Sequence, residues 1–170
     1  MGTPAVRLDS PTEDERALAR VRILMVDDRP DNLFATRAVL EDLGEDLVAT
    51  TSAVEAVDHL LRQDFCLILL DVMMPGMDGF AVCETLRGNP ATAAIPVLML
   101  TGLCSHISQL VAFDAGATDY LIKPFVPEEL ISKVENLLCR AERLQAYHKN
   151  PIQNSSQPRK KSSPVLSGDK

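Results

Sequence analysis

The chain has 170 residues, of which 46% are hydrophobic and 24% charged, a composition typical of one globular domain with tails. Its formal net charge of −7 disfavours nucleic-acid binding, because phosphate contacts need clustered Lys and Arg. No apolar run approaches the roughly 20 residues of a membrane span and the polar N-terminus does not resemble a secretory signal, so we expect a cytoplasmic protein with no membrane partner.

Strand-like and helix-like segments alternate five times along the chain. In chain order, the predicted elements cover residues 22–27 (strand), 30–44 (helix), 45–52 (strand), 52–63 (helix), 65–71 (strand), 79–89 (helix), 95–102 (strand), 105–116 (helix), 118–123 (strand) and 126–149 (helix). Helix ends are predicted at Gly44, Gly88 and Gly116, because Gly favours the position just past a helix. Ser52, followed three residues later by Glu55, predicts a capping box at a helix start.

Three of the predicted strands, 22–27, 65–71 and 95–102, are apolar in their interiors rather than alternating, so both faces of each should be buried. Such strands separated by helices are typical of a parallel sheet wrapped by helices. We therefore predict an α/β fold of the flavodoxin-like, doubly wound type, with a five-stranded parallel sheet in the order 2-1-3-4-5 and five helices.

Three segments divide the chain. Residues 1–20 form an acidic lead-in that we expect to be disordered, residues 21–146 form the folded domain, and residues 147–170 form a tail, rich in Pro, Ser and Lys, that should also be disordered. The last helix is longer than this fold needs. Its far end is expected either to dock or dimerise, or to fray into a linker.

The four cysteines lie far apart, without the spacing of a metal site: Cys66, Cys83, Cys104 and Cys139. We expect them to be small, buried, apolar side chains. Unpaired cysteines are also consistent with the cytoplasm.

Polar side chains follow four of the predicted strands, where each strand ends. They are Asp27, Asp28, Asp71, Thr101 and Lys123. Because ligands of open parallel sheets bind beyond the carboxyl ends of the strands, these residues should converge on one edge. Three carboxylates together need a cation, and Mg²⁺ suits an open site of carboxylates and waters. A carboxylate can also act as a nucleophile and form an aspartyl phosphate.

Four stretches in this order, "ILMVDDRPDN", "LILLDVMMPGMDGF", "IPVLMLTG" and "AGATDYLIKPF", resemble the motifs of response-regulator receiver domains of two-component signalling. The resemblance spans about residues 21–140. It implies that Asp71 accepts a phosphoryl group, that Asp28 ligates Mg²⁺ directly, and that Asp27 does so directly or through water. The backbone carbonyl of Met73 would also hold the metal.

The resemblance assigns further roles. Thr101 and Lys123 would each contact a phosphoryl oxygen, and the Lys123–Pro124 peptide bond would be cis. Tyr120 stands where the family carries an aromatic side chain that swings inward with the threonine, so Thr101 and Tyr120 would form the switch. Plain strand packing of Tyr120 remains an alternative. For Asp27 and Asp28 the alternative is that they only cap the first helix, because Asp often caps a helix.

We therefore interpret the chain as a stand-alone receiver that is phosphorylated by a sensor histidine kinase or a histidine phosphotransfer protein and is not a turnover enzyme. Output to a downstream effector, or a homodimer, would use the face of the fourth helix, the fifth strand and the fifth helix. Apolar Met73 and Leu103, beside the phosphoryl group, are expected to limit the attacking water.

Three alternatives remain open. The chain could be a docking module that works without phosphorylation, or a receiver that is part of a larger regulator or hybrid kinase. A metal-dependent phosphatase with an aspartyl nucleophile is disfavoured, because such haloacid-dehalogenase-like enzymes need a second acid where this chain has Met73.

Overall fold

A computed structural model describes residues 20–76, 78–102 and 106–149, with the backbone alone for 106–108 and 142–149. The predictions for residues 1–19, for the tail after 149, and for Leu103 and Cys104 lie outside the described residues. Within the described ranges, no helix combines the length and the hydrophobicity that crossing a lipid bilayer requires.

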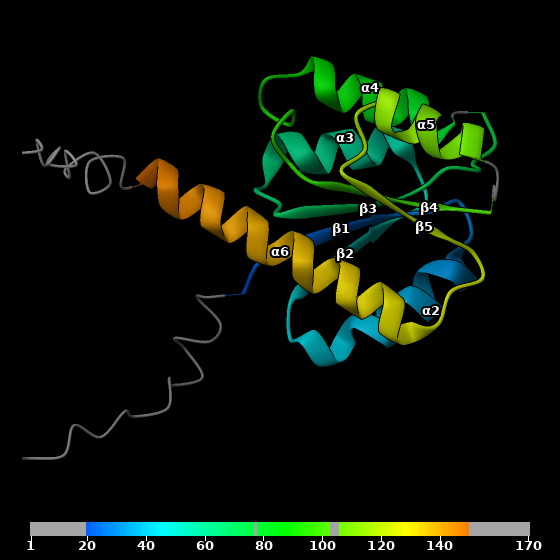
Figure 1. The fold of residues 1–170 in the computed structure, drawn as a ribbon, viewed down its shortest axis with the longest axis horizontal. Helices are drawn as coiled ribbons and strands as arrows, with labels where there is room; N and C mark the ends of the chain where they lie inside the picture. The colour runs from blue at the N-terminus through cyan, green and yellow to red at the C-terminus, as the bar shows by residue number, and fades with distance from the viewer. Residues whose placement is uncertain (1–19, 77, 103–105, 150–170) are drawn as a thin grey trace, which may run out of the picture.

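The centre of the fold is a five-stranded parallel sheet (Figure 1). Its strands are β1 (Arg22–Val26), β2 (Asp46–Thr50), β3 (Leu67–Asp71), β4 (Val97–Thr101) and β5 (Asp119–Ile122). The spatial order is β2-β1-β3-β4-β5, and every neighbouring pair is parallel. The predicted sheet and strand order are therefore confirmed.

Five helices cover the two faces of the sheet, as predicted. They are α2 (Pro30–Leu40), α3 (Ala53–Arg62), α4 (Gly79–Gly88), α5 (His106–Asp114) and α6 (Pro127–Lys149). A short 3-10 turn, η1 (Glu41–Leu43), extends α2 and ends at Gly44, which has a positive φ of 71°. Figure 1 shows α3, α4 and α5 on one face and α2 with α6 on the other.

Strand β3 explains why two apolar layers form. Ile68 and Leu70 belong to the cluster under α3, α4 and α5, whereas Leu67 and Leu69 belong to the cluster under α2 and α6. Successive side chains of a strand point to opposite faces, so an entirely apolar strand fills both layers. Each fully buried leucine contributes about 1.5–3 kcal/mol through the hydrophobic effect.

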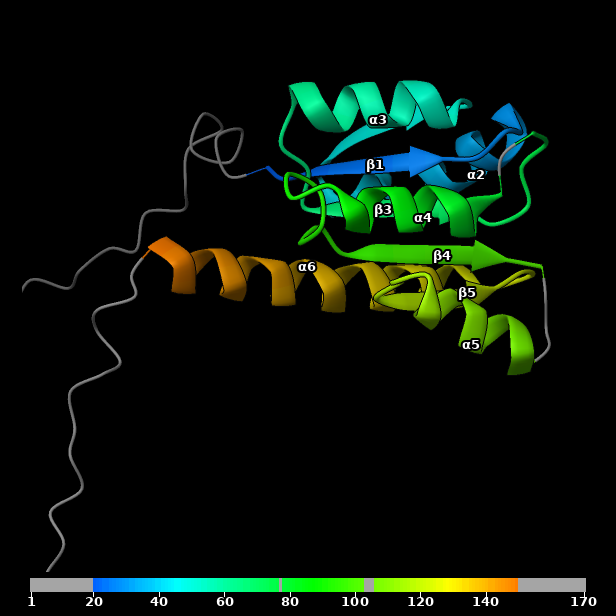
Figure 2. The ribbon, with the colours of Figure 1, turned by 90° about the horizontal axis from the view of Figure 1, so that it is seen from above.

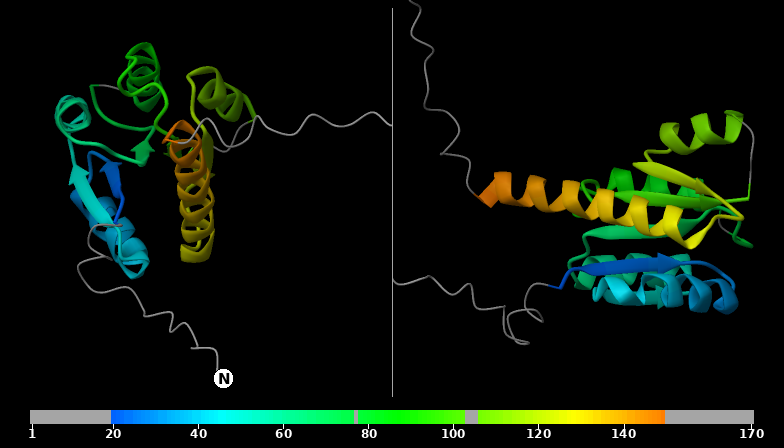
Figure 3. Two further views of the ribbon diagram at one scale, coloured as in Figure 1. Left: turned by 90° about the vertical axis from the view of Figure 1, so that its left-hand side faces the viewer. Right: turned by 60° about the horizontal axis from the view of Figure 1, so that its bottom comes forward.

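Helix α6 runs antiparallel to the strands and continues past their amino ends (Figures 2 and 3). Its buried residues recur at helical spacing along the part that packs on the sheet: Leu130, Val134, Leu137, Leu138 and Ala141. The predicted extension of the last helix is therefore present, while its role stays a prediction.

Cysteine burial was predicted only partly correctly. Cys83 is buried and Cys66 is half-buried, but Cys139 is exposed. Cys139 follows buried Leu138 in α6, and one further step around the helix turns the side chain towards solvent.

The capping box at the start of α3 is confirmed on one side and wrong on the other. The Ser52 hydroxyl accepts a hydrogen bond from the backbone N–H of Glu55 at 3.4 Å. The Glu55 carboxylate does not return to the Ser52 N–H. It accepts instead from the Thr50 hydroxyl at 2.7 Å, and Thr50 Oγ1 accepts from the Ser52 N–H at 3.1 Å. The Thr50 hydroxyl thus bridges the Ser52 N–H and the Glu55 carboxylate.

Candidate functional site

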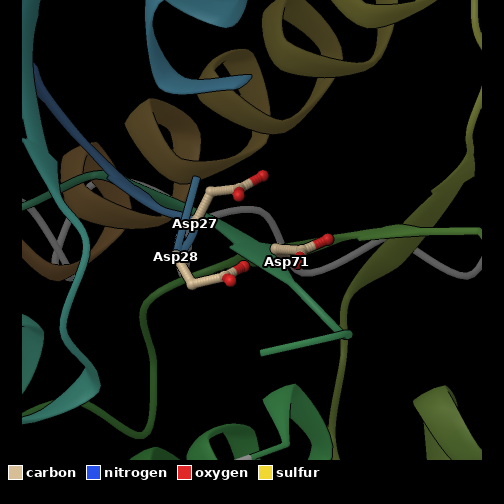
Figure 4. Close-up of side chains that lie close together, drawn as sticks. All are labelled: Asp27, Asp28 and Asp71. Atoms are coloured by element: carbon tan, nitrogen blue, oxygen red, sulfur yellow. The ribbon is translucent and has the colours of Figure 1, made fainter. Parts of the chain in front are cut away.

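Three carboxylates meet where β1 and β3 end. Asp27 and Asp28 follow β1, and Asp71 is the last residue of β3, which pairs directly with β1. Figure 4 shows the three side chains pointing to the same side from these adjacent strand ends. One carboxylate oxygen from each lies within 4.8 Å of the others. The predicted convergence follows from the parallel pairing of the two strands.

Burial makes negative charge energetically unfavourable in this cluster. Asp27 and Asp71 are each only 4% exposed, and Asp28 is half-buried. Burial raises the pKa of the Asp71 carboxyl above its ordinary value, and the hydrogen bond and charge of Lys123 only partly oppose this effect. The neighbouring charges of Asp27 and Asp28 raise the same pKa further.

Lys123 supplies the nearest positive charge. Its Nζ lies 2.8 Å from Asp71 Oδ1 and 3.2 Å from Asp27 Oδ2, so one ammonium group bridges two of the three carboxylates. Burial by itself would lower the pKa of Lys123, but the hydrogen bond to Asp71 and the nearby carboxylates outweigh burial and raise it. Lys123 follows β5, and its peptide bond with Pro124 is cis, as predicted.

Thr101 ends β4 beside these groups. It is 4% exposed, and its carbonyl accepts a hydrogen bond from the Lys123 N–H at 2.7 Å. In the sheet, Leu100 pairs with Asp71 and Thr101 pairs with Ile122. Thr101 is therefore fixed between the strand that carries Asp71 and the strand that leads to Lys123.

Asp27 is held by more donors than the sequence predicted. Its Oδ1 accepts from the Arg29 N–H at 2.9 Å, and the Asn32 side-chain amide donates to both of its oxygens, at 3.1 and 3.0 Å. Arg29, not an aspartate, is the N-cap of α2. The alternative in which Asp27 or Asp28 caps this helix is therefore wrong.

Asn32 is a residue of the site that sequence reasoning missed. It lies within the quoted stretch "ILMVDDRPDN", in the first turn of α2. Its spacing, one helical turn after the paired aspartates, was the available signal. An asparagine there has several common roles, so the spacing alone could not select this one.

Tyr120 lies on β5, which β4 separates from the strand that carries Asp71. Its half-buried ring contacts Phe113 of α5 edge-on, with ring centroids 5.6 Å apart, and Lys133 Nζ of α6 lies 5.9 Å from the Tyr120 centroid. Lys133 also forms a 2.7 Å ion pair with Asp119. Tyr120 thus connects β5 with both neighbouring helices, and these contacts fit strand packing as well as a switch.

A cleft of about 660 Å³ opens over the carboxylates. Asp28, Asn32, Asp71 and Lys123 line it, together with Met73, whose side chain is 61% exposed. The group that would enter the cleft therefore meets carboxylates, an ammonium group and an apolar side chain.

Helix α4 begins against the strand end that carries Asp71. The Asp78 carboxylate caps the helix by accepting from the Ala81 N–H at 2.8 Å. Gly79 donates its N–H to the Val72 carbonyl at 2.9 Å and lies so close to β3 that it has no room for a side chain. The close approach at Gly79 sets the position of α4 relative to Asp71.

The donor set suits a hard divalent cation such as Mg²⁺. Carboxylate oxygens are the ligands that Mg²⁺ prefers, and an open cleft leaves room for the waters it retains. Asp28 is a clear candidate ligand, because it makes no hydrogen bond or ion pair with the part of the chain that the structure describes. The residues present therefore fit the metal that the sequence predicted.

A larger hollow, of about 1060 Å³, lies at the opposite edge, by the amino ends of the strands. Four of its charged residues, Arg22, Arg37, Glu45 and Asp46, already have partners in the fold. Arg22 pairs with Asp46 at 2.9 Å, and the Glu45 carboxylate accepts from the Val21 N–H at 2.8 Å. Size alone gives this hollow no chemistry, so the smaller cleft is the functional candidate.

Comparison with known proteins agrees with this assignment. The profile of the response regulator receiver domain matches residues 23–135. The DNA-binding dual master transcriptional regulator RpaA of Synechocystis sp. is 41% identical over 123 residues, which are 72% of this chain and 51% of that protein. The transcriptional regulatory protein ResD of Bacillus subtilis is 37% identical over 134 residues, or 78% of this chain and 55% of ResD. The chain thus spans about half the length of these curated relatives.

Solved structures give the same answer at the level of the fold. A CheY-like receiver domain protein from Methanospirillum hungatei has a TM-score of 0.68 and 28% identity, over 74% of this chain and 99% of that one. The receiver domain of a signal transduction histidine kinase from Syntrophus aciditrophicus has a TM-score of 0.67 and 35% identity, over 72% and 93% of the two chains.

Proposed function

The chain belongs to the response regulator receiver family of two-component signalling, and we propose that its Asp71 accepts a phosphoryl group from the phosphohistidine of a sensor histidine kinase or a histidine phosphotransfer protein. The observation that carries this proposal is the placement of the Asp71 carboxylate: it is buried at a strand end, 2.8 Å from Lys123 and beside two further carboxylates. A buried carboxylate held by an ammonium group is positioned to act as a nucleophile.

In the transfer, a carboxylate oxygen of Asp71 forms the new bond to phosphorus while the phosphorus–nitrogen bond of the donor breaks. The electron pair of that bond stays on the donor imidazole. Lys123 and the Thr101 hydroxyl would each hold one phosphoryl oxygen, so the chain contributes mainly position and charge.

The carboxylates of Asp27, Asp28 and Asp71 and the backbone carbonyl of Met73 would hold Mg²⁺. When bound, the ion neutralises the carboxylates and the oxygens of the phosphoryl group. Of the three acids, Asp28 and Asp71 are the proposed direct ligands, while Asp27, which already accepts from several donors, would act through water.

Output is proposed to occur through contact, at the face formed by α5, β5 and α6. This face carries exposed apolar side chains, among them Leu110 and Phe113 of α5, and Tyr120 lies beside them. Phosphorylation adds about −1.5 to −2 charge, which would draw Thr101 and Lys123 towards it and shift Tyr120. A downstream effector or a second copy of the chain would recognise the shifted face.

The wider context of the receiver is also a proposal. The matched region is only 51% of a relative named as a DNA-binding regulator, and one similar structure is the receiver of a histidine kinase. These findings support the alternative that this receiver is part of a larger regulator or hybrid kinase. The predicted absence of nucleic-acid binding and the cytoplasmic location stay predictions.

The test is the intact mass of the protein after incubation with Mg²⁺ and acetyl phosphate. The wild type should gain one phosphoryl mass, and Asp71→Asn should gain none. Asp31→Asn, which alters an exposed aspartate in the first turn of α2, is the matched control and should behave as the wild type. No gain in either protein would favour a docking module that works without this chemistry, whereas a gain in Asp71→Asn would mean that another residue is the acceptor.

A further inference from the structure

The side-chain amide of Asn32 lies directly in front of the Asp27 carboxylate. Its Nδ2 is 3.1 Å from Oδ1 and 3.0 Å from Oδ2, so it is almost equidistant from the two oxygens. A nitrogen at that point stands roughly midway between the oxygens, where a cation bound by both of them would have to sit. Asn32 therefore occupies the bidentate position of this carboxylate.

The outer sides of the same carboxylate are also engaged. Oδ1 accepts from the Arg29 N–H at 2.9 Å, and Oδ2 lies 3.2 Å from Lys123 Nζ. Two carboxylate oxygens offer about four lone-pair sites in total. Arg29, Asn32 and Lys123 together make four contacts to them, so little capacity remains for a metal ion at Asp27.

The other two acids of the cluster are less engaged. Asp71 has the hydrogen bond from Lys123, and Asp28 has no hydrogen bond or ion pair within the described part of the chain. The cluster is thus unequal: it offers two accessible carboxylates and a third that its own neighbours screen.

This inequality bears on which divalent ion the site prefers. Ca²⁺ takes six to eight oxygen ligands and is often held by bidentate carboxylates, whereas Mg²⁺ binds through one or two carboxylates and keeps several waters. A site that withholds its third carboxylate therefore suits Mg²⁺ better than Ca²⁺.

We propose that Asn32 is a specificity-determining residue of the metal site, which screens Asp27 from direct ligation and thereby makes the site select Mg²⁺ over Ca²⁺. The inference rests on the proposed Mg²⁺ site. It concerns a side chain of α2 that would touch neither the metal nor the phosphoryl group.

A purely structural role for Asn32, joining the start of α2 to the end of β1, makes a different prediction. Loss of such a link would loosen the whole cluster and lower the affinities for both ions by the same factor. Loss of a screen changes the ratio of the two affinities, because the freed Asp27 carboxylate benefits the ion that uses more carboxylate oxygens. The ratio therefore separates the two roles.

The experiment is calorimetric titration of the metal-free full chain with MgCl₂ and, separately, with CaCl₂, without any phosphodonor. Asn32→Ala should increase the affinity for Ca²⁺ relative to Mg²⁺ by roughly tenfold or more, the scale of outer-shell effects on metal sites. Asn32→Ser, which shortens the side chain but keeps it polar, should change the ratio in the same direction. The control is Asn136→Ala, at an exposed asparagine of α6, which should leave both affinities unchanged.

The outcomes separate this inference from the proposed function. If the wild type binds neither ion, the proposed metal site fails and the inference fails with it. If the wild type binds Mg²⁺ but both Asn32 variants keep its ratio of affinities, the selectivity role alone is wrong. An equal loss of affinity for both ions would also refute it, in favour of the structural role.

Discussion

Gly79 allows the sharpest test of how the fold positions Asp71. A Cβ added at Gly79 would lie 2.8 Å from Val72 Cα and 3.1 Å from the carbonyl carbon of Asp71, and still closer to the Asp71 carbonyl oxygen. These are backbone atoms, so no change of rotamer can make room. In Gly79→Ala either β3 or the start of α4 has to move.

The cost follows from this contact. Overpacking a rigid site typically costs about 1–3 kcal/mol, and the better helix propensity of Ala recovers at most about 1 kcal/mol. We expect a net loss of about 1–2 kcal/mol and a fall in Tm of about 3–8 °C for a domain of this size. Because the crowded atoms belong to Asp71 itself, phosphorylation should slow by about tenfold or more, since small misplacements of reacting groups are costly.

The assay combines thermal unfolding with the initial rate of phosphorylation by acetyl phosphate. Gly88→Ala is the matched control, because Gly88 is exposed at the other end of the same helix and an added Cβ meets no atom within 4 Å. This control should keep the wild-type rate and gain up to about 1 kcal/mol of stability. A Gly79→Ala variant as stable and as fast as the wild type would refute the steric argument. A variant that is destabilised but fast would show that α4 moves and β3 does not.

Three further predictions concern charge, water access and surface contacts. Burial raises the pKa of the Asp71 carboxyl above its ordinary value of 3.8, so the contribution of this carboxyl to stability is present below pH 3.8 and is lost as the pH rises through the raised pKa. Urea unfolding in EDTA should therefore find Asp71→Asn more stable than the wild type at pH 7, with the gain vanishing near pH 3.5. A less stable variant at pH 7 would contradict this prediction. Met73→Asn should shorten the phosphorylated lifetime by admitting the attacking water, as phosphate release would measure, and an unchanged or longer lifetime would remove the role given to Met73. Lys133→Met removes the ion pair with Asp119 and the contact with the Tyr120 ring. Because the paired groups are one-third exposed, urea unfolding should show a loss of less than about 1 kcal/mol in the free energy of unfolding, whereas a loss above about 2 kcal/mol would mean that Lys133 holds the fold together.

The general plan of the site could be predicted from sequence because it depends on topology. Once the apolar strands are assigned to a parallel sheet, the residues that follow them must share an edge. Asp28, Asp71 and Lys123 reach the same cleft for that reason alone. No side-chain detail is needed, so a single sequence is enough.

The parts that sequence reasoning missed depend on distances between particular atoms. Ser52 and Glu55 have the spacing of a capping box, but spacing could not reveal that the Thr50 hydroxyl donates to the Glu55 carboxylate and accepts from the Ser52 N–H. Asn32 is similar, because its amide is informative only once it is found in front of Asp27. Local pattern predicts which groups are near one another, whereas competition between donors decides which of them pair.

Strand β5 connects the site with the contact between Tyr120 and α5. Its last residues lead to Lys123, whose N–H is bonded to the Thr101 carbonyl at 2.7 Å, while Tyr120, earlier in the same strand, contacts Phe113 of α5. This strand has only four residues, and closely packed protein interiors transmit strain. In the proposed switch, a displacement of Lys123 would therefore pass along β5 to the contact between Tyr120 and α5. The half-buried ring of Tyr120 packs against the apolar cluster under α3, α4 and α5, and its aromatic contact and its contact with the Lys133 cation add only about 0.5–1.5 kcal/mol each. In the proposed switch, one charge-assisted hydrogen bond to the phosphoryl group, worth about 1.5–3 kcal/mol, would outweigh either of these two contacts alone.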